Sequence, residues 1–295
     1  MSALHSVAAV VLNWRDVDRT LRALGSLVAC GGVARVVVVD NESDGSLARA
    51  VAACGELAHV RLVELPENLG FAGGFNAALR QSDALEHEFV LALNNDAVVT
   101  PGAVDALVAS AVADPDVALL GPRVVDLDGV SEATAGVVRA WRGDTRPTRD
   151  GEQVDYLSWA CVLVRTEALR SLGSLDERFF MYWEDVDFGL RVARAGRRMS
   201  VVQDALVVHE RSSNRSRHRE AIKTYHTWSL VRLARKQRGA WVLGAPAWIV
   251  GSAVKNALRR DLPLVQATAR GVRLGLRRAG PAHAELRRTP AAAAP

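Results

Sequence analysis

Three carboxylates directly follow a run of large apolar and aromatic side chains. Residues 179–183 are Phe, Phe, Met, Tyr and Trp, and Glu184, Asp185 and Asp187 come next. A protein rarely places acids beside such side chains unless they are paired, bind a metal or take part in chemistry. Burial raises the pKa of a carboxyl group, so the segment predicts a general base. The sequence leaves open a simple helix N-terminus, where acids complement the helix dipole.

Further polar side chains stand where three short apolar segments end. In chain order they are Asn13, Asp40, Asn41, Asn94, Asn95 and Asp96. Ligands of an open α/β sheet bind beyond the carboxyl ends of its strands, so we expect these residues to gather at one edge. Asp40, which can only accept hydrogen bonds, would suit a ribose hydroxyl or a base N–H. Each residue alone is also an ordinary strand cap, but three strand ends together favour a nucleotide site.

A glycine-rich segment that contains Asn68, Gly70 and Asn76 precedes a predicted helix. Backbone N–H groups in such a loop can bind phosphate, and turn formation is an equal alternative. The segment does not follow the G-x-G-x-x-G pattern, so a dinucleotide-dependent dehydrogenase is not indicated. His209 follows another apolar run, and a single histidine is a cap or core residue unless the fold brings it near Asp96.

Strand and helix patterns alternate along the first two thirds of the chain. Short Val-rich runs predict strands buried on both faces, and apolar residues at helical spacing predict helices between them. Strands are expected at 7–12, 36–39, 60–65, 89–93, 159–164 and 201–209, and helices at 17–29, 47–51, 74–81, 101–112, from 166 and at 184–195. Residues 121–155 are expected to form loops and short strands, and Asp187 and Arg191 to pair on one helix. The pattern predicts an α/β domain with a mainly parallel sheet.

Charge is distributed unevenly over the 295 residues. Residues 1–208 hold 19 Lys and Arg against 29 Asp and Glu, whereas residues 209–295 hold 18 against 4. An acidic body with a basic tail predicts a polyanionic partner, either a membrane surface or nucleic acid. The high apolar content excludes global disorder. No secretory signal is visible and the three cysteines are far apart, which predicts a cytoplasmic protein without a disulfide framework.

The order and spacing of these motifs resemble the family 2 glycosyltransferases with the GT-A fold. The resemblance covers about residues 6–215 and is closest to bacterial rhamnosyltransferases that extend polyprenyl-diphosphate-linked sugars. It implies a catalytic base at Asp185 with Glu184 beside it, and a divalent metal, Mg²⁺ or Mn²⁺, bound by Asp96 and His209. The first acid of the family's Asp-x-Asp motif is Asn94 here, which reduces the charge at that metal site.

The resemblance also implies where the substrates bind. The expected donor-binding residues are Asn13, Asp40, Asn41, Asn68, Gly70, Asn76, Asn94 and Asn95. The implied activity is inverting transfer of a sugar such as rhamnose from a dTDP- or UDP-sugar to a hydroxyl of a cell-envelope glycan or lipid-linked acceptor. Trp159 stands where the family normally has a small residue near the acceptor, so it either reshapes that pocket or packs in the core.

Two other functions remain open at this point. One is a non-catalytic protein that binds a nucleotide sugar or a polyanion through its basic tail. The other is a sugar-nucleotide pyrophosphorylase, which ranks lower because no N-terminal glycine-rich triphosphate loop is visible. The sequence does not determine the sugar, the acceptor or the oligomeric state.

The sequence divides into a catalytic domain at 1–215 and a basic helical extension at 216–295. Residues 239–254 are mostly apolar but short for a membrane-spanning helix, and they contain Pro246. Three tryptophans, Trp228, Trp241 and Trp248, are expected to anchor the extension in an anionic membrane surface, at the inner face of the cell membrane. The interleaved apolar residues disfavour nucleic acid. The alternative is a helical subdomain that packs on the catalytic domain.

Overall fold

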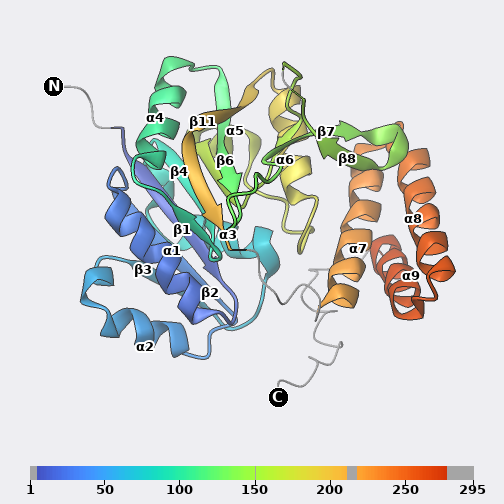
Figure 1. The fold of residues 1–295 in the computed structure, drawn as a ribbon, viewed down its shortest axis with the longest axis horizontal. Coiled ribbons are helices and arrows are strands. Elements are labelled where there is room, and N and C mark those ends of the chain that lie inside the picture. Colours follow the sequence, from blue (N-terminus) through green and yellow to red (C-terminus); the bar gives the residue numbers. More distant parts are fainter. Residues whose placement is uncertain (1–4, 150, 211–217, 278–295) are drawn as a thin grey trace.

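An eight-stranded mixed sheet forms the centre of the computed structural model, which describes residues 5–149, 151–210 and 218–277 (Figure 1). Its strand order is β3-β2-β1-β4-β10-β6-β11-β5. The strands are β1 (Val7–Asn13), β2 (Arg35–Asn41), β3 (Arg61–Leu65), β4 (Phe89–Asn94), β5 (Ala97–Val99), β6 (Val117–Val125), β10 (Cys161–Arg165) and β11 (Arg198–His209). Only β10 and β5 run antiparallel to their described neighbours, which confirms the prediction of a mainly parallel sheet.

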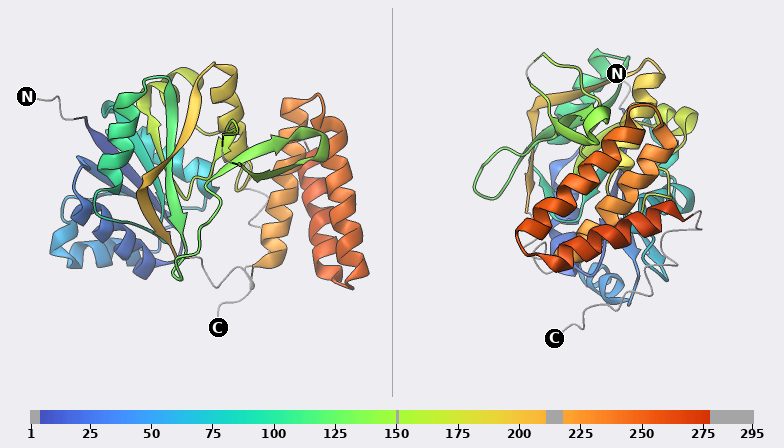
Figure 2. Two further views of the ribbon diagram at one scale, coloured as in Figure 1. Left: turned by 45° about the horizontal axis from the view of Figure 1, so that its top comes forward. Right: turned by 90° about the vertical axis from the view of Figure 1, so that its right-hand side faces the viewer.

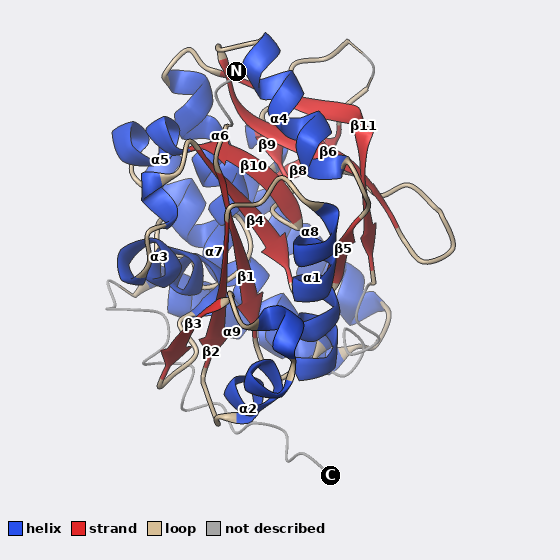
Figure 3. Cartoon of the chain, turned by 90° about the vertical axis from the view of Figure 1, so that its left-hand side faces the viewer, coloured by secondary structure: helices blue, strands red, loops and turns tan. Residues whose placement is uncertain are grey.

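Helices cover both faces of this sheet (Figure 3). They are α1 (Val17–Cys30), α2 (Ser46–Ala53), α3 (Gly70–Gln81), α4 (Ala103–Ala113), α5 (Thr166–Leu172) and α6 (Glu184–Arg194). One core cluster joins the strands to α1 and α4, and a second joins them to α3, α5 and α6. Because both faces are covered, β1, β2 and β4 are continuous apolar runs without alternating polar residues.

A second, three-stranded sheet projects from the region that the sequence predicted as loops and short strands. It consists of β7 (Ala135–Arg139), β8 (Asp144–Pro147) and β9 (Tyr156–Leu157), in the order β8-β7-β9. The single turn of 3₁₀ helix between β7 and β8, residues Ala140–Arg142, is named η3. This hairpin reaches the C-terminal helices (Figure 2).

The strand β6 was missed by the sequence analysis because Gly121 and Pro122 suggest a loop. Pro122 is tolerated because β6 pairs with β10 only as far as Leu120, so the missing N–H faces no strand on that side. On the other side, β11 shifts its register between Val202 and Leu206, directly after the pairing with Pro122. The proline therefore lies where the ladder is already interrupted.

Three helices at the C-terminal end pack together beside the sheet domain (Figure 2). They are α7 (Arg219–Gln237), α8 (Trp241–Leu258) and α9 (Leu262–Leu276). Trp228 is 1% exposed and Trp241 5% exposed, and the ring of Trp248 stacks on His226. The prediction that Trp228 and Trp241 insert into a membrane is therefore wrong, because both are buried by apolar packing, and Trp248 is partly buried against the cluster that contains Trp241. These residues instead lie within a packed group of helices, as the alternative prediction had it.

No helix within the described ranges is long and apolar enough to cross a membrane. The predicted division of the chain at 215/216 falls among residues that the structure does not describe. Trp159 packs in the core, the second of the two alternatives; it is 4% exposed and makes edge-to-face contacts with Phe71, Phe75 and Phe188. Its bulk fills the core between α3 and α6.

Candidate active site

The ends of β1 and β2 carry a connected polar network. Asn13 lies opposite Asp40 in the parallel register and donates a 2.7 Å hydrogen bond from Nδ2 to Asp40 Oδ1. Thr20 Oγ1, on α1, contacts Asn13 Oδ1 at 2.8 Å, and Asn95 Nδ2 donates to Thr20 Oγ1 at 3.2 Å. Because Asn94 ends β4 beside β1, the three predicted strand ends do meet at one edge of the sheet.

Only one of the two carboxylate oxygens of Asp40 takes part in this network of described residues. The residue is 3% exposed, and Oδ2 has no hydrogen-bond partner among the described atoms. Buried acceptors are normally paired, so an unpaired one at the ligand edge of a parallel sheet fits a donor group of a bound molecule. A ribose hydroxyl or a base N–H offers such a donor.

Asn41 and Asn68 hold the start of α3. Asn41 Oδ1 accepts from the N–H of Leu69 at 2.8 Å, and its Nδ2 donates to the Gly70 carbonyl at 3.0 Å. Asn68 Oδ1 accepts from the Gly70 N–H at 2.8 Å. Both side chains are therefore used in building the turn, which agrees with the turn-forming alternative for the glycine-rich segment. The helix itself starts at Gly70, four residues before the predicted start.

Asn76 lies apart from the other predicted donor residues. It is 3% exposed, and its Nδ2 donates to the Leu175 carbonyl at 2.7 Å and to Glu177 Oε1 at 3.0 Å. These bonds tie the second turn of α3 to the segment that leads toward α6. The structure thus places Asn76 where it positions a loop.

Asp96 lies directly before β5 and His209 ends β11, and the two side chains face each other. His209 pairs with Ala97 in the antiparallel register, and its Nε2 lies 3.1 Å from Asp96 Oδ1. The other ring nitrogen, Nδ1, lies 3.0 Å from Glu132 Oε2. Burial lowers the pKa of His209, but the hydrogen bonds to Asp96 and Glu132 outweigh it, so the net pKa is raised. The fold therefore supplies the contact that the sequence could only propose.

The donor set at this position fits a divalent cation. Adjacent ligands of an octahedral ion with bonds of about 2.1 Å lie about 3 Å apart, close to the separation of Asp96 Oδ1 and His209 Nε2. Glu132 on the far nitrogen is the kind of partner that orients a metal-binding histidine. No group of three or more His, Cys, Asp or Glu side chains in the described ranges is arranged to hold a metal alone. Remaining ligands would have to come from a bound phosphate and water.

Glu184 and Asp185 form the first turn of α6 and differ in their environment. Glu184 is 7% exposed, and burial followed by the charge of Asp185 raises its pKa well above the usual range. Burial raises the pKa of the partly buried Asp185 to about 6, although the Val186 N–H donates to Oδ1 at 2.7 Å. Because the pKa of Asp185 stays below neutral pH, this carboxyl group is mostly ionised at pH 7. Asp185 can therefore accept a proton.

The backbone just before this pair is strained. Tyr182 and Trp183 have φ values of 68° and 69°, in the left-handed region that large side chains rarely adopt. Helix α7 holds this segment in place, since Ser229 Oγ donates to the Met181 carbonyl at 2.9 Å and the His226 ring lies 5.1 Å from that of Trp183. The position of Asp185 thus depends on two residues of α7 that lie more than 40 positions further along the chain.

The start of α3 also contacts this segment. The Phe180 carbonyl accepts from the N–H of Phe71 at 2.8 Å, and a Cβ atom at Gly70 would overlap that carbonyl oxygen. Since Asn41 holds Gly70 from the other side, a continuous set of contacts joins the end of β2 to the segment before Asp185. This link joins the predicted nucleotide-binding edge of the sheet to the segment that carries the predicted base.

Asp187 has a structural position. It is fully buried and lies 3.2 Å from Arg191 Nε, as predicted, but also 2.8 Å from Lys236 Nζ and 3.1 Å from Gln237 Nε2. The last two residues belong to α7, so Asp187 ties that helix to α6. Its carboxylate is thus engaged in holding α6 against α7.

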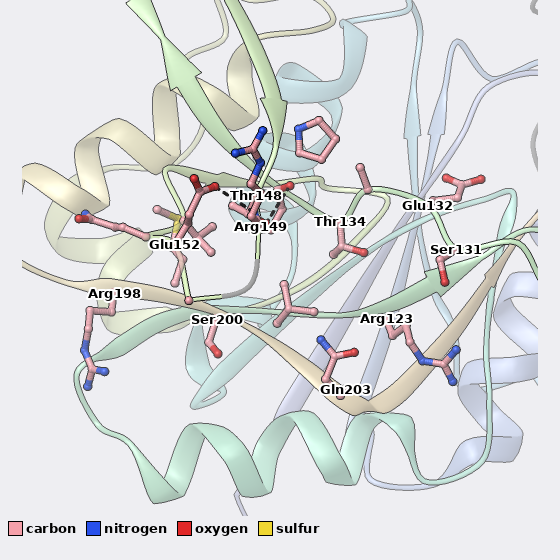
Figure 4. A pocket seen from close by; sticks show the side chains of 18 of the residues that line it. Arg123, Ser131, Glu132, Thr134, Thr148, Arg149, Glu152, Arg198, Ser200 and Gln203 are labelled. Atoms are coloured by element: carbon pink, nitrogen blue, oxygen red, sulfur yellow. Dashed lines mark hydrogen bonds between the residues drawn. The ribbon is translucent and has the colours of Figure 1, made fainter.

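A groove of about 910 Å³, lined in part by Glu132, opens next to the predicted metal ligand His209 (Figure 4). It runs along β6 and β11 from Glu132 to Arg198, with Arg123 and Gln203 between them. None of the predicted site residues lines this groove. Among the described residues that do line it, Glu132 is the one that contacts His209. The groove is therefore a neighbour of the site and lies apart from Asp185.

Sequence reasoning missed three contributors to this site: Thr20, Glu132 and the Phe180 carbonyl. Thr20 is hidden in the helical pattern of α1, and a backbone carbonyl has no sequence signal. Glu132 lies in a Gly- and Asp-rich segment that gave no reason to single out one carboxylate. A search for acids near His209 would have required the pairing of β6 with β11, which the sequence did not reveal.

Known proteins resemble this chain in both sequence and fold. The sequence profile described as "Glycosyltransferase like family 2" matches residues 5–244. The N-acetylglucosaminyl-diphospho-decaprenol L-rhamnosyltransferase of Mycobacterium tuberculosis is 30% identical over 273 residues, which cover 78% of this chain and 88% of the relative.

Two solved structures have a similar fold. One is GalNAc-T7 with UDP, GalNAc and Mn²⁺, with a TM-score of 0.62 and 13% identity, covering 80% of this chain and 48%, about half, of that chain. The other is a mannosyltransferase from Pyrobaculum calidifontis in complex with GDP-Man and Mn²⁺, with a TM-score of 0.54 and 19% identity, covering 95% of this chain and 77% of that chain. With a profile match over most of its length, this chain belongs to the family 2 glycosyltransferases and has their GT-A fold.

Proposed function

We propose that this glycosyltransferase inverts the anomeric centre and uses Asp185 as its general base. The observation that carries the proposal is the buried carboxyl pair at the start of α6, where burial raises the pKa of both groups and that of Asp185 to about 6. A base works best when its pKa lies near the working pH. Both carboxyl groups lie together in the first turn of α6, whereas a glycosidase needs two groups that flank the same bond.

The step begins with a bound acceptor whose hydroxyl oxygen attacks the anomeric carbon. As the new C–O bond forms, Asp185 takes the hydroxyl proton, and the bond between the anomeric carbon and the diphosphate oxygen breaks. The nucleoside diphosphate leaves with the bonding electron pair, so attack and departure occur on opposite faces of the sugar. Asp185 then releases its proton to solvent.

The donor is proposed to be a nucleoside-diphospho-sugar, with dTDP-rhamnose or a UDP-sugar as first candidates. The unpaired Asp40 Oδ2 supports a ribose or base contact at the end of β2, with Asn13 and Asn95 beside it. The name of the mycobacterial relative supports rhamnose as the sugar.

A divalent cation, Mg²⁺ or Mn²⁺, is proposed to be held by Asp96 and His209. When bound, it would neutralise the negative charge that develops on the leaving diphosphate. Glu132 would keep the His209 ring oriented, and Asn94 in place of an acid lowers the charge of the site. Titrations with each ion distinguish Mg²⁺ from Mn²⁺.

The acceptor is proposed to be lipid-linked, and the protein to work in the cytoplasm at the inner face of the cell membrane. The mycobacterial relative, whose name specifies a decaprenol-linked substrate, supports this class of acceptor. Such an acceptor keeps its lipid in the bilayer, so the enzyme must reach a membrane surface.

A thermal-shift panel of uridine, thymidine and guanosine diphosphates and their sugars, with and without Mn²⁺, tests the donor site. A ligand at 100 times its Kd stabilises the fold by about 2.7 kcal/mol, a readable shift. Asp185→Asn should lose about 100- to 10,000-fold in sugar transfer while keeping this shift. The exposed Asp204→Asn is the matched control. Full transfer by Asp185→Asn, or no shift with any nucleotide, would refute the proposal.

A further inference from the structure

The side of α8 that does not contact its neighbours is apolar. Leu243 is 78% exposed, Val250 61%, Val254 51% and Leu258 80%. Their spacing of seven, four and four residues places them on one face of the helix. Seven of the thirteen large hydrophobic side chains that are exposed in the described ranges lie on α8 and α9. An exposed patch of this kind marks a binding surface.

A tryptophan from a distant part of the chain extends this surface. The turn η3 at the tip of the β7–β8 hairpin packs on α8 so closely that a Cβ atom at Gly244 would overlap its backbone. Trp141, within that turn, is 67% exposed, and the Arg142 guanidinium lies 5.3 Å from its ring centre. An exposed tryptophan beside an arginine is a typical residue pair of a membrane interface.

The charge around this surface is positive. Helix α8 contains no Asp or Glu, and Lys255, Arg259 and Arg260 are exposed at its C-terminal end. Arg142 lies near the other end; its Nε is 3.6 Å from Asp144 Oδ2, and half of its side chain remains exposed. This pattern complements a layer of anionic lipid headgroups. A second copy of the chain would instead bring the same cations against one another.

We propose that Trp141 and the outward face of α8 together form a surface that binds an anionic lipid bilayer. This surface differs from the predicted anchors, because Trp228, Trp241 and Trp248 pack inward. The inference deepens the proposed function and rests on it in one respect: the lipid-linked acceptor supplies the reason to bind a bilayer. The apolar residues enter the headgroup layer while the cations bind its phosphates.

Vesicle flotation of the full-length protein tests the surface directly. The vesicles contain phosphatidylcholine alone or phosphatidylcholine with phosphatidylglycerol. The double variant Leu243→Glu, Val250→Glu should bind the vesicles about 100-fold more weakly, because less apolar surface enters the lipid. The control is Leu127→Glu with Val130→Glu, since these residues are 71% and 61% exposed on another part of the protein. It should bind as the unchanged protein does.

A second arm removes charge alone. Replacing Lys255, Arg259 and Arg260 by Gln should lower binding about 100-fold on the phosphatidylglycerol vesicles and leave binding to neutral vesicles unchanged. No vesicle binding by the unchanged protein, or equal binding by both double variants, would overturn the inference. So would a dimer that the α8 variant alone fails to form. Nucleotide-induced stabilisation of the same preparations reports separately on the donor site.

Discussion

At the residue scale, the carboxyl pair at the start of α6 makes activity depend on pH. Asp185 must be ionised to accept a proton, and burial raises its pKa from 3.8 to about 6. We expect kcat/KM to fall tenfold per pH unit below about pH 6, where an exposed aspartate would keep activity to about pH 4. A pH–rate profile with a soluble acceptor measures this. An acid limb near pH 4 would contradict the burial of Asp185.

The same burial costs stability, which the Asp185→Asn variant should recover. Because the folded pKa is raised, the folded state binds more protons than the unfolded state between pH 3.8 and about 6, and stability falls as pH rises through that range. Above pH 6, Asp185→Asn should raise the free energy of unfolding by at most about 3 kcal/mol, because each pKa unit corresponds to about 1.4 kcal/mol. Urea unfolding at pH 7.5 and pH 3.5 measures the difference. An equal increase in the free energy of unfolding at both pH values would contradict an electrostatic origin of the effect.

The carboxylate of Glu132 is predicted to set the metal affinity. It holds Nδ1 of His209, whose Nε2 faces Asp96. Glu132→Gln should weaken Mn²⁺ binding about 10- to 100-fold, as the loss of such a partner does at other metal sites. Mn²⁺ titration of nucleotide-induced stabilisation measures it. Glu167→Gln, with a side chain 74% exposed, is the control, and equal affinities in both variants would contradict the prediction.

At the element scale, two glycines with similar backbone angles separate strain from contact. Gly70 has a φ of 74° and Gly102 a φ of 79°. A side chain costs about 1–2 kcal/mol at either position, but at Gly70 it would also overlap the Phe180 carbonyl, whereas nothing lies within 4 Å at Gly102. Gly70→Ala should therefore destabilise more than Gly102→Ala and reduce sugar transfer. Urea unfolding and transfer rates measure both, and equal losses would show that the contact contributes nothing.

The elements that could be predicted are those that a local sequence pattern determines. The Val-rich strands β1 and β2 and the helix α1 were predicted because burial on two faces and helical spacing leave clear signals. Strand β6 was missed because Pro122 is acceptable only where its neighbours stop pairing, which is a property of the sheet. The start of α3 was placed late because its glycines suggested a loop, and the supporting hydrogen bonds come from Asn41, 29 residues earlier.

At the scale of the whole molecule, the sequence did not show how its last third packs against the rest. The charge step at residue 209 and the tryptophans suggested a separate, membrane-bound tail. In the structure, Leu230 and Leu233 of α7 join Phe179 and Trp183 in one apolar cluster. A tryptophan that inserts into lipid and one that packs against a neighbouring helix have the same local sequence. Only the long-range packing distinguishes them.

This packing predicts that a chain ending at residue 217 does not form a stable domain. Without α7, the buried Asp187 loses Lys236 and Gln237, and the segment before Asp185 loses Ser229 and His226. Removing partners from a buried charge costs about 3–5 kcal/mol, a large part of the stability of an ordinary domain.

Circular dichroism melting and transfer assays compare this truncation with a chain that ends at residue 277 and keeps all three helices. The shorter chain should aggregate or melt at a markedly lower temperature, and any soluble fraction should transfer no sugar because the strained backbone at Tyr182 and Trp183 relaxes. Cooperative melting at an unchanged temperature would instead establish the predicted domain boundary near residue 215. It would leave α7 as a passive attachment, even though the hydrogen bond from Ser229 to Met181 ties it to the catalytic segment.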